Sequence, residues 1–337
     1  MKYAVIGLGA IGSIIGGLLT KSGEDVVLIG KKNQVEIINQ KGIRIDGIHG
    51  SIVVENVHAS TDLSLLGNVD VVIICIKSQG TQNLANDLRK FVNKSALLIS
   101  LQNGVRNLKI LREATGNKAV SGAILFNALY SRPGEVELTI KGGLLLEADN
   151  SSYDTIKYLV NSLKKEGLDV KIVDDIEGYA WSKLVVNLQN AVTALTGQTV
   201  NESISDKDSR GVLIATMEEG LNVLEQSGIS IKTLPDIDPR RIIRRLSLFN
   251  SALLKIGSRM MKIKANARTS MWQSLSRGKP TEIDYINGEI INLAKKNNLK
   301  APINTKLVEL IKEAEKTHAT KSFEPSKLKE LLKINFK

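Results

Sequence analysis

Short apolar runs alternate with amphipathic stretches along the first half of the chain. The apolar runs predict strands, and the stretches with an apolar residue every three or four positions predict helices. We expect strands at residues 2–7, 25–30, 69–76, 96–100, 118–126, 135–140, 143–147 and 169–175, and a hairpin or loop pair at 43–54. We expect helices at residues 10–23, 81–92, 105–114 and 151–167. Such alternation is typical of an α/β fold with a doubly wound parallel sheet.

The pattern changes at about Glu177, because long helical periods dominate from there and strand patterns are lost. We therefore predict two domains, residues 1–174 with the parallel sheet and residues 175–337 with helices only. The amphipathic tail at 326–337 predicts one more helix.

The chain carries more basic than acidic residues. Its 337 residues include 46 Lys and Arg against 35 Asp and Glu, a net charge of +11. This excess favours an acidic partner: nucleic acid, an anionic membrane, or a small ligand with phosphate or carboxylate groups. The densest basic cluster, residues 238–246, predicts a helix with Asp238 as N-cap and Pro239 as first residue. Because no aromatic residues alternate with these charges and no apolar run reaches the ~18 residues of a membrane span, we expect a small ligand, no nucleic acid and no membrane.

Cysteine and histidine offer little chemistry in this sequence. The single cysteine, Cys75, lies in an apolar run and forms no internal disulfide, so we expect a core residue and a cytoplasmic protein. His49, His58 and His318 are far from one another in sequence, which predicts surface or loop roles and no metal site. The sequence leaves open whether the protein forms a homodimer.

A glycine-rich turn, "GLGAIG", stands directly between the first strand and the first helix. In a Rossmann-type sheet the first glycine permits a tight turn, the second lets the backbone approach a pyrophosphate, and the third packs the helix on the strand. The predicted cofactor-binding segment is Gly7, Leu8, Gly9, Ala10, Ile11 and Gly12. A tight turn without a ligand is the alternative.

Two lysines follow the second strand, where a protein that binds NAD usually has an acidic residue for the ribose 2′-hydroxyl. Lys31 and Lys32 occupy this place, and Asp25 comes too early for the role. Positive charge favours a 2′-phosphate, so we predict NADPH as cofactor, with Lys31 as a ligand. Solvated loop lysines are the alternative.

A candidate acid lies in "WSKLVVNLQN", where Lys183, Asn187 and Asn190 are spaced i, i+4, i+7 along one helical stripe. A lysine among apolar neighbours has a lowered pKa and can donate a proton near neutral pH. The asparagines would bind substrate. A stripe that merely faces solvent is the alternative.

Four further polar residues are candidates for the site. Lys77 and Asn103 each follow an apolar strand, and ligands of open α/β sheets bind beyond the carboxyl ends of strands. Ser270 stands at a predicted helix start and Glu282 early in the next helix. Glu282 could accept a hydrogen bond from a substrate hydroxyl, and Ser270 could hold a substrate carboxylate.

The segments "IKSQGT", "LQNGV", "WSKLVVN" and "SMWQSL…TEIDYINGEI" resemble those of the ketopantoate reductase (2-dehydropantoate 2-reductase) family over nearly the whole chain. The resemblance implies NADPH-dependent reduction of 2-dehydropantoate to (R)-pantoate, toward pantothenate and coenzyme A. It implies roles for six residues: Lys183 as proton donor, Glu282, Ser270 and Asn187 as substrate ligands, and Lys77 and Asn103 lining the cofactor and active site. We therefore predict Glu282 as a second catalytic residue and as a cofactor ligand, and Asn103 as a substrate ligand too. Lys31 falls where the family commonly has an arginine for the 2′-phosphate. Asn190, Ser274 and Ala267 depart from the family pattern, Ala267 because some members have a polar substrate contact there.

Alternative functions remain beside this one. The same scaffold could reduce a different 2-oxo acid, or the protein could be a non-catalytic NADP(H) sensor. A basic nucleic-acid binder is a third alternative.

Overall fold

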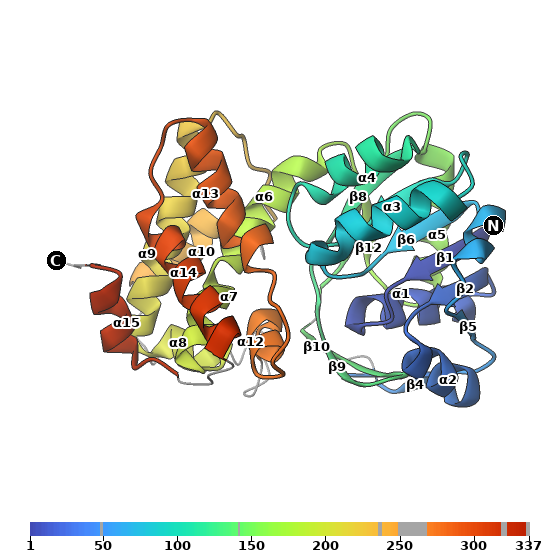
Figure 1. Ribbon diagram of the computed structural model, residues 1–337, viewed down its shortest axis with the longest axis horizontal. Helices are drawn as coiled ribbons and strands as arrows, with labels where there is room; N and C mark the ends of the chain where they lie inside the picture. The colour runs from blue at the N-terminus through green and yellow to red at the C-terminus, as the bar shows by residue number, and fades with distance from the viewer. Residues whose placement is uncertain (48–49, 141, 235–237, 249–267, 318–321, 335–337) are drawn as a thin grey trace. The chain divides into compact units, whose positions relative to one another are not determined.

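The computed structural model describes residues 1–47, 50–140, 142–234, 238–248, 268–317 and 322–334 (Figure 1). The chain forms two compact units, Met1–Ile176 and Glu177–Lys337. The first unit contains the predicted doubly wound sheet and the second is helical, so the predicted fold class is confirmed. His49 and His318 lie outside the described residues.

The first unit is built on an eight-stranded sheet in the order β12-β11-β8-β7-β6-β1-β2-β5. Its neighbouring strands pair in parallel except for β8 and β11, which are antiparallel. The strand bounds are β1 Lys2–Ile6, β2 Asp25–Ile29, β5 His58–Ser60, β6 Val71–Ile74, β7 Leu97–Ser100, β8 Ala119–Ile124, β11 Leu144–Glu147 and β12 Val170–Val173.

Helices cover both faces of this sheet (Figure 1). Apolar residues of α1 (Ala10–Lys21) and α5 (Tyr153–Lys165) share one core with the sheet, and those of α3 (Thr81–Phe91) and α4 (Asn107–Thr115) share the other. The four residues of β6 are buried, as expected for a central strand with helices on both sides. Each fully buried Ile or Leu contributes about 1.5–3 kcal/mol to stability.

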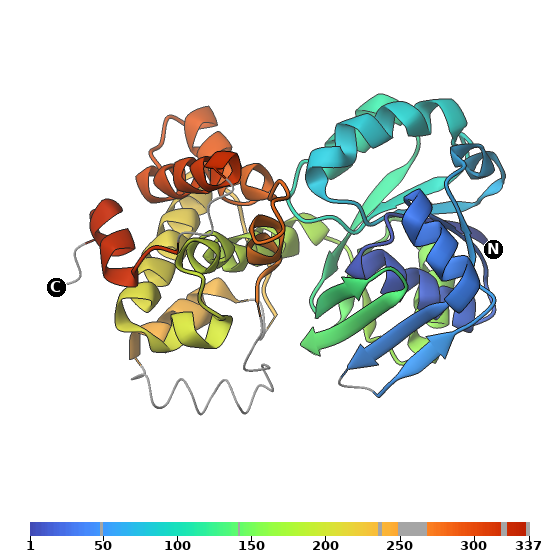
Figure 2. The ribbon, with the colours of Figure 1, turned by 60° about the horizontal axis from the view of Figure 1, so that its bottom comes forward.

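A second, four-stranded sheet has the order β4-β3-β10-β9 (Figure 2). It consists of β3 Ile43–Gly47, β4 Ile52–Val54, β9 Asn127–Arg132 and β10 Glu135–Ile140. Helix α1 lies between the two sheets, because a Cβ on Gly16 would meet Leu28 of β2 and one on Gly17 would meet Ile45 of β3. The predicted hairpin at 43–54 is part of this sheet.

Three elements were not predicted from the sequence: strands β5 and β9 and helix α2 (Lys32–Lys41). Neither β5 nor β9 was predicted, because β5 has only three residues and β9 is half-exposed without apolar alternation. His58, expected on the surface or in a loop, is exposed but begins the edge strand β5. Cys75 packs against the core, and burial raises the pKa of its thiol to about 12.

The second unit contains helices around the 20-residue α9 (Lys207–Gln226), and its described residues include no strand. The other helices are α6 Ile176–Asn187, α7 Gln189–Thr196, α8 Val200–Ser205, α10 Pro239–Leu248, α12 Ser270–Leu275, α13 Asn287–Lys296, α14 Pro302–Thr317 and α15 Pro325–Leu331, with a 3₁₀ turn, η3, at Ile283–Tyr285. Asp238 caps α10 by accepting a hydrogen bond from the Arg241 amide, as predicted. None of the helices in the described part of the chain combines the length and apolar character of a membrane span.

Candidate active site

In the glycine-rich turn, the first and third glycines are tightly packed and the middle glycine is not. Gly7 has φ +101°, and a Cβ there would lie 2.8 Å from the Ile76 amide nitrogen. A Cβ on Gly12 would lie 2.0 Å from the Gly7 carbonyl oxygen, so both positions require glycine. A Cβ on Gly9 would meet no atom within 4 Å. The backbone at Gly9 therefore borders open space.

Helix α1 starts at this open space. Gly9 is its N-cap and provides no side chain, and the first turn contains no acidic residue. The free N–H groups of a helix N-terminus bind anions, because they point outward and carry the positive end of the helix dipole. The turn and the start of α1 thus fit the pyrophosphate of a dinucleotide.

Gln34, in α2 (Lys32–Lys41), fastens this turn to its surroundings. Its Nε2 donates to the Leu8 carbonyl oxygen at 2.7 Å and to the Tyr130 hydroxyl oxygen at 3.0 Å. Its Oε1 accepts from the Lys31 amide at 3.1 Å. Sequence reasoning missed Gln34 and Tyr130, because no motif marks them and their contacts cross 26 and 96 residues.

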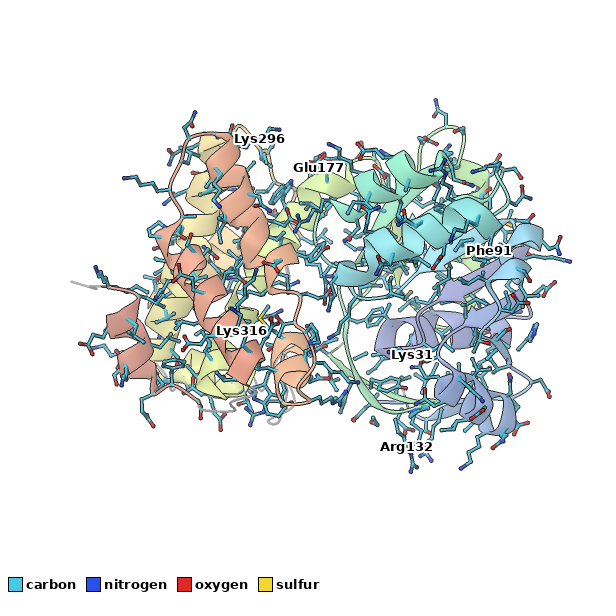
Figure 3. The ribbon with its side chains drawn as sticks, in the orientation of Figure 1. Lys31, Phe91, Arg132, Glu177, Lys296 and Lys316 are labelled. Carbon is cyan, nitrogen blue, oxygen red and sulfur yellow. The ribbon has the colours of Figure 1, made fainter. Side chains whose placement is uncertain are left out.

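The two lysines after β2 differ in their surroundings. Lys31, labelled in Figure 3, is exposed directly before α2. Lys32 is also exposed, and its ammonium lies 4.0 Å from a carboxylate oxygen of Glu36. Among the described residues, an ion pair is therefore found for Lys32 but not for Lys31. Lys31 keeps its positive charge available for an anion.

The loops after β6 and β7 come together in the structure. Lys77 follows β6 and immediately precedes the 3₁₀ turn η2, Ser78–Gly80. Asn103 follows β7 and is half-buried. The Ser78 hydroxyl donates to the Asn103 carbonyl oxygen at 2.7 Å and joins the two loops. Lys77 and Asn103 thus lie in adjacent loops at the carboxyl edge of the sheet.

The predicted stripe of Lys183, Asn187 and Asn190 does not lie on one helix. Helix α6 ends at Asn187 and α7 begins at Gln189, so the single-helix prediction is wrong. The Leu188 amide donates to the Leu184 carbonyl, an α-helical i→i−4 bond, and also to the Val185 carbonyl, an i→i−3 bond. The Ala191 amide donates to the Leu188 carbonyl at 3.4 Å, a second i→i−3 bond. Such i→i−3 bonds tighten the chain. Asn190 is buried beyond this tightened turn.

The surroundings of Lys183 make its ammonium group more acidic than that of a solvent-exposed lysine. Burial lowers the pKa of its ammonium group to about 8, and the negative charge of Glu282 opposes this shift. Glu282 is itself only 8% exposed. It stands directly before η3 and not within the next helix, which corrects the expected position. Lys183 and Glu282 therefore interact electrostatically in the fold, although 282 − 183 = 99 positions separate them in the sequence.

Helix α12 is tied to α7 by a pair of threonines. Ser270 is the first residue of α12 and is exposed, and Thr269 is its N-cap. The Thr269 hydroxyl lies 2.9 Å from the Thr193 hydroxyl of α7 in a buried hydrogen bond. The helix that begins at Ser270 is therefore anchored to the helix that contains Asn190. Neither threonine was found from the sequence.

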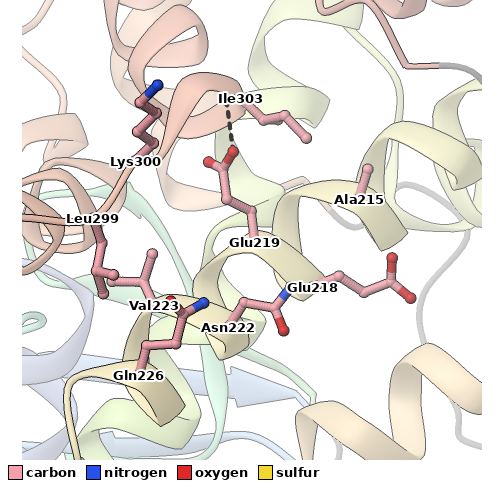
Figure 4. Close-up of a pocket in the computed structure, with 9 residues that line it drawn as sticks. All are labelled: Ala215, Glu218, Glu219, Asn222, Val223, Gln226, Leu299, Lys300 and Ile303. Carbon is pink, nitrogen blue, oxygen red and sulfur yellow. Dashed lines mark hydrogen bonds between the residues drawn. The ribbon is translucent and has the colours of Figure 1, made fainter.

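A buried series of side-chain hydrogen bonds, through Asn287, Asn304 and Glu219, ends at the Leu188 carbonyl. Asn287 Nδ2 donates to the Leu188 carbonyl at 3.4 Å and to Asn304 Oδ1 at 2.9 Å. Asn304 Nδ2 donates in turn to Glu219 at 2.9 Å. Glu219 also accepts the backbone amides of Ile303 and Asn304 and so caps α14 (Figure 4). These bonds connect α9, α13 and α14 to the turn after Asn187.

A cavity of about 470 Å³ lies outside these candidates (Figure 4). Its lining residues come from α9 and from the segment that leads into α14: Ala215, Glu218, Glu219, Asn222, Val223, Gln226, Leu299, Lys300 and Ile303. None of the predicted site residues lines it. One of its two carboxylates, Glu219, caps α14.

A doubly wound sheet with a glycine-rich turn, followed by a helical unit with a low-pKa lysine, defines a two-domain protein of the Rossmann type. The model of the family described as "Ketopantoate reductase PanE/ApbA" matches residues 3–151, and that of its C-terminal part matches residues 175–315. The chain therefore belongs to the ketopantoate reductase PanE/ApbA family. The resemblance found in the sequence is confirmed.

Relatives match over nearly the whole chain. The 2-dehydropantoate 2-reductase of Pyrococcus horikoshii is 32% identical over 321 residues, which cover 94% of this chain and 98% of that protein. The crystal structure of a PanE/ApbA family ketopantoate reductase from Ralstonia eutropha covers 94% of this chain and 99% of its own, with 28% identity and a TM-score of 0.81. The ternary structure of D-mandelate dehydrogenase with NADH and anilino(oxo)acetate has a TM-score of 0.78 at 23% identity, covering 94% and 99%, and shares the fold.

Proposed function

We propose that this protein reduces 2-dehydropantoate to (R)-pantoate with NADPH, a step toward pantothenate and coenzyme A. The observation that carries the proposal is Lys183, whose pKa burial lowers to about 8 beside the carboxylate of Glu282. Family membership and a 2-dehydropantoate 2-reductase relative at 32% identity support it. Residues 1–174 would act as the cofactor-binding domain and residues 175–337 as the substrate and catalytic domain.

The first unit would hold the dinucleotide. The amides of the turn from Gly7 to Gly12 and of the α1 N-terminus would bind the pyrophosphate, since the space at Gly9 is open. Lys31 would bind the 2′-phosphate, because positive charge at this place favours the phosphate over a hydroxyl. Lys77 and Asn103 would line the nicotinamide end, at the carboxyl edge of the sheet.

The second unit would supply the acid. A reduced nicotinamide dinucleotide, when bound, would supply the hydride for the carbonyl carbon of the 2-oxo acid and would itself be oxidised. Lys183 stabilises the negative charge that develops on the carbonyl oxygen and transfers a proton to it. Glu282 accepts a hydrogen bond from the substrate's hydroxyl group and keeps the Lys183 pKa from falling further. The product is the hydroxy acid, and Lys183 regains its proton from solvent.

The remaining polar candidates would orient the substrate. Ser270 would bind its carboxylate from the exposed start of α12. Asn187 and Asn190 would contact substrate from the two sides of the turn at Leu188, and Asn103 stays a predicted substrate ligand. The anionic substrate and cofactor suit the positive charge of the chain.

The direct test is NADPH oxidation with 2-dehydropantoate and with the same acid lacking its hydroxyl group. We expect turnover with the first and a strong loss of kcat/KM with the second, because Glu282 would lose its hydrogen-bond partner. Faster turnover of another 2-oxo acid would identify a different reductase on this scaffold. Tight NADPH binding without oxidation by any 2-oxo acid would identify a sensor and overturn the proposal.

Replacing Lys31 should change cofactor preference. We expect Lys31→Ala to raise the Kd for NADPH about 10-fold or more and to leave NADH binding unchanged, since one charged contact is worth about 1.5–3 kcal/mol. Lys32→Ala is the matched control, because Lys32 lies beside Glu36. Fluorescence titration of both cofactors measures the effect. Equal losses in the two variants would contradict a specific role for Lys31.

Turnover should fall as pH rises through about 8. The ammonium form of Lys183 is the acid, and this form is lost above its pKa of about 8. Because the charge of Glu282 raises that pKa, Glu282→Gln should move the falling limb to lower pH, in addition to lowering the rate. The pH profiles of kcat for both proteins measure the limb. A limb that stays in place in the variant would show that another group titrates.

A further inference from the structure

The loops that follow β6 and β7 share a buried hydrogen-bond network. Its members Ser78, Thr81, Ser100, Gln102 and Asn107 are each at most 7% exposed. Ser100 donates to Gln102 Oε1 at 3.1 Å, and Gln102 Nε2 donates to the Thr81 hydroxyl at 2.7 Å. Thr81 is the first residue of α3, so the network already connects the end of β7 to the helix that follows β6.

Asn107, the first residue of α4, completes the network. Its Oδ1 accepts from the Thr81 hydroxyl at 2.9 Å. Its Nδ2 donates to the Asn103 carbonyl at 2.6 Å and to the Ser78 hydroxyl at 3.2 Å. Ser78 donates to the same Asn103 carbonyl at 2.7 Å. One buried amide therefore contacts both loops and the backbone of a candidate site residue.

We propose that Asn107 is a positioning residue, which holds the two loops with Lys77 and Asn103 in the arrangement that receives the nicotinamide ring. This inference rests on the proposed function. The network joins the loops after β6 and β7 to α3 and α4, whereas Gln34 of α2 holds the glycine-rich turn and Lys31 directly precedes α2. Loss of Asn107 thus affects the nicotinamide end of the cofactor and spares the phosphate end.

Asn117 offers a matched control in the same unit. It is 4% exposed, close to the 3% of Asn107. Its Nδ2 donates to the carbonyls of Asn93, Lys94 and Ala96, just before β7 begins. An asparagine with similar burial and as many hydrogen bonds thus lies at the amino edge of the sheet. Replacing either by alanine should lower Tm, but only Asn107 should affect the site.

The test compares Asn107→Ala with Asn117→Ala in the full chain. The probes are NADPH and its fragment without nicotinamide, ADP-ribose 2′-phosphate. In Asn107→Ala we expect the fragment to bind as in wild type, while the affinity advantage of NADPH over the fragment falls about fivefold. Hydride transfer in single turnover should slow about 10- to 100-fold, because a small misplacement of reacting atoms is costly. Asn117→Ala should keep both values.

Thr81 provides a second pair of variants, because its hydroxyl donates to Asn107 and accepts from Gln102. Thr81→Ser keeps the hydroxyl and should behave like wild type, whereas Thr81→Val should reproduce the Asn107→Ala pattern. Equal behaviour of Asn107→Ala and Asn117→Ala, or of the two Thr81 variants, would overturn the positioning role. Failure of the proposed function is a separate result, in which the wild type itself oxidises no NADPH with any 2-oxo acid.

Discussion

Lys183→Ala is expected to lower kcat by on the order of 10²- to 10⁴-fold, the usual contribution of a general acid. The Kd for NADPH should stay close to wild type, since the cofactor-binding turn belongs to the other unit. Stopped-flow measurement of NADPH oxidation and fluorescence titration separate the two effects. Normal turnover in this variant would end the proposed mechanism.

Two further lysine variants sharpen this test. Lys183→Arg keeps a positive charge, but a guanidinium with a pKa above about 12 does not release its proton at neutral pH. We therefore expect turnover to remain low, and full recovery would mean that charge alone is needed. Lys316→Ala removes an exposed lysine near the end of α14 (Figure 3) and should leave turnover unchanged.

Gly9→Ala is expected to weaken dinucleotide binding without loss of stability. Its Cβ would meet no protein atom within 4 Å, and the φ of −82° suits any residue, so Tm should not change. The methyl group would occupy the space proposed for the pyrophosphate. Overlap of this kind costs about 1–3 kcal/mol, or about 5- to 150-fold in Kd. Calorimetric titration with NADPH and thermal unfolding measure the two properties.

Gly12→Ala should behave differently, although the same methyl group is added. Its Cβ would lie 2.0 Å from the Gly7 carbonyl oxygen, so α1 must shift away from the turn. We expect both a lower Tm and weaker NADPH binding. If Gly9→Ala binds NADPH like wild type, the turn is not the phosphate site, whatever Gly12→Ala does.

The central strands of the large sheet and the helical character of the second unit were predictable from the sequence, whereas α2, β5 and β9 were missed. The apolar runs of β1, β2, β6 and β7 are buried by helices on both faces, and burial of this kind produces the continuous apolar pattern seen in the sequence. The small sheet was only partly predictable. Strands β3 and β10 pair in parallel across about 90 residues, and local sequence contains no information about such a partner.

The candidate site likewise has residues that local sequence predicts and residues that only distant contacts reveal. The glycine spacing and the two lysines after β2 are local features, and the structure shows a tight turn at Gly7 and close packing at Gly12. The interruption between α6 and α7 at Leu188 could not be predicted from the sequence, because no glycine or proline occurs near it. It accompanies a hydrogen bond from Asn287, 99 residues later by the difference of their numbers. Gln34, Thr193 and Asn107 likewise act through contacts with distant segments.

By itself, the sequence determined the α/β and helical halves, the glycine-rich turn and the identity of the candidate acid, Lys183. The sequence also predicted a lowered pKa for this lysine, but only the tertiary structure showed that Glu282 opposes the shift and that Asn107 joins two loops. The physical reason is the range of the interactions. Periodicity and glycine geometry depend on neighbours along the chain, whereas desolvation, charge coupling and buried hydrogen bonds depend on segments that only folding brings together.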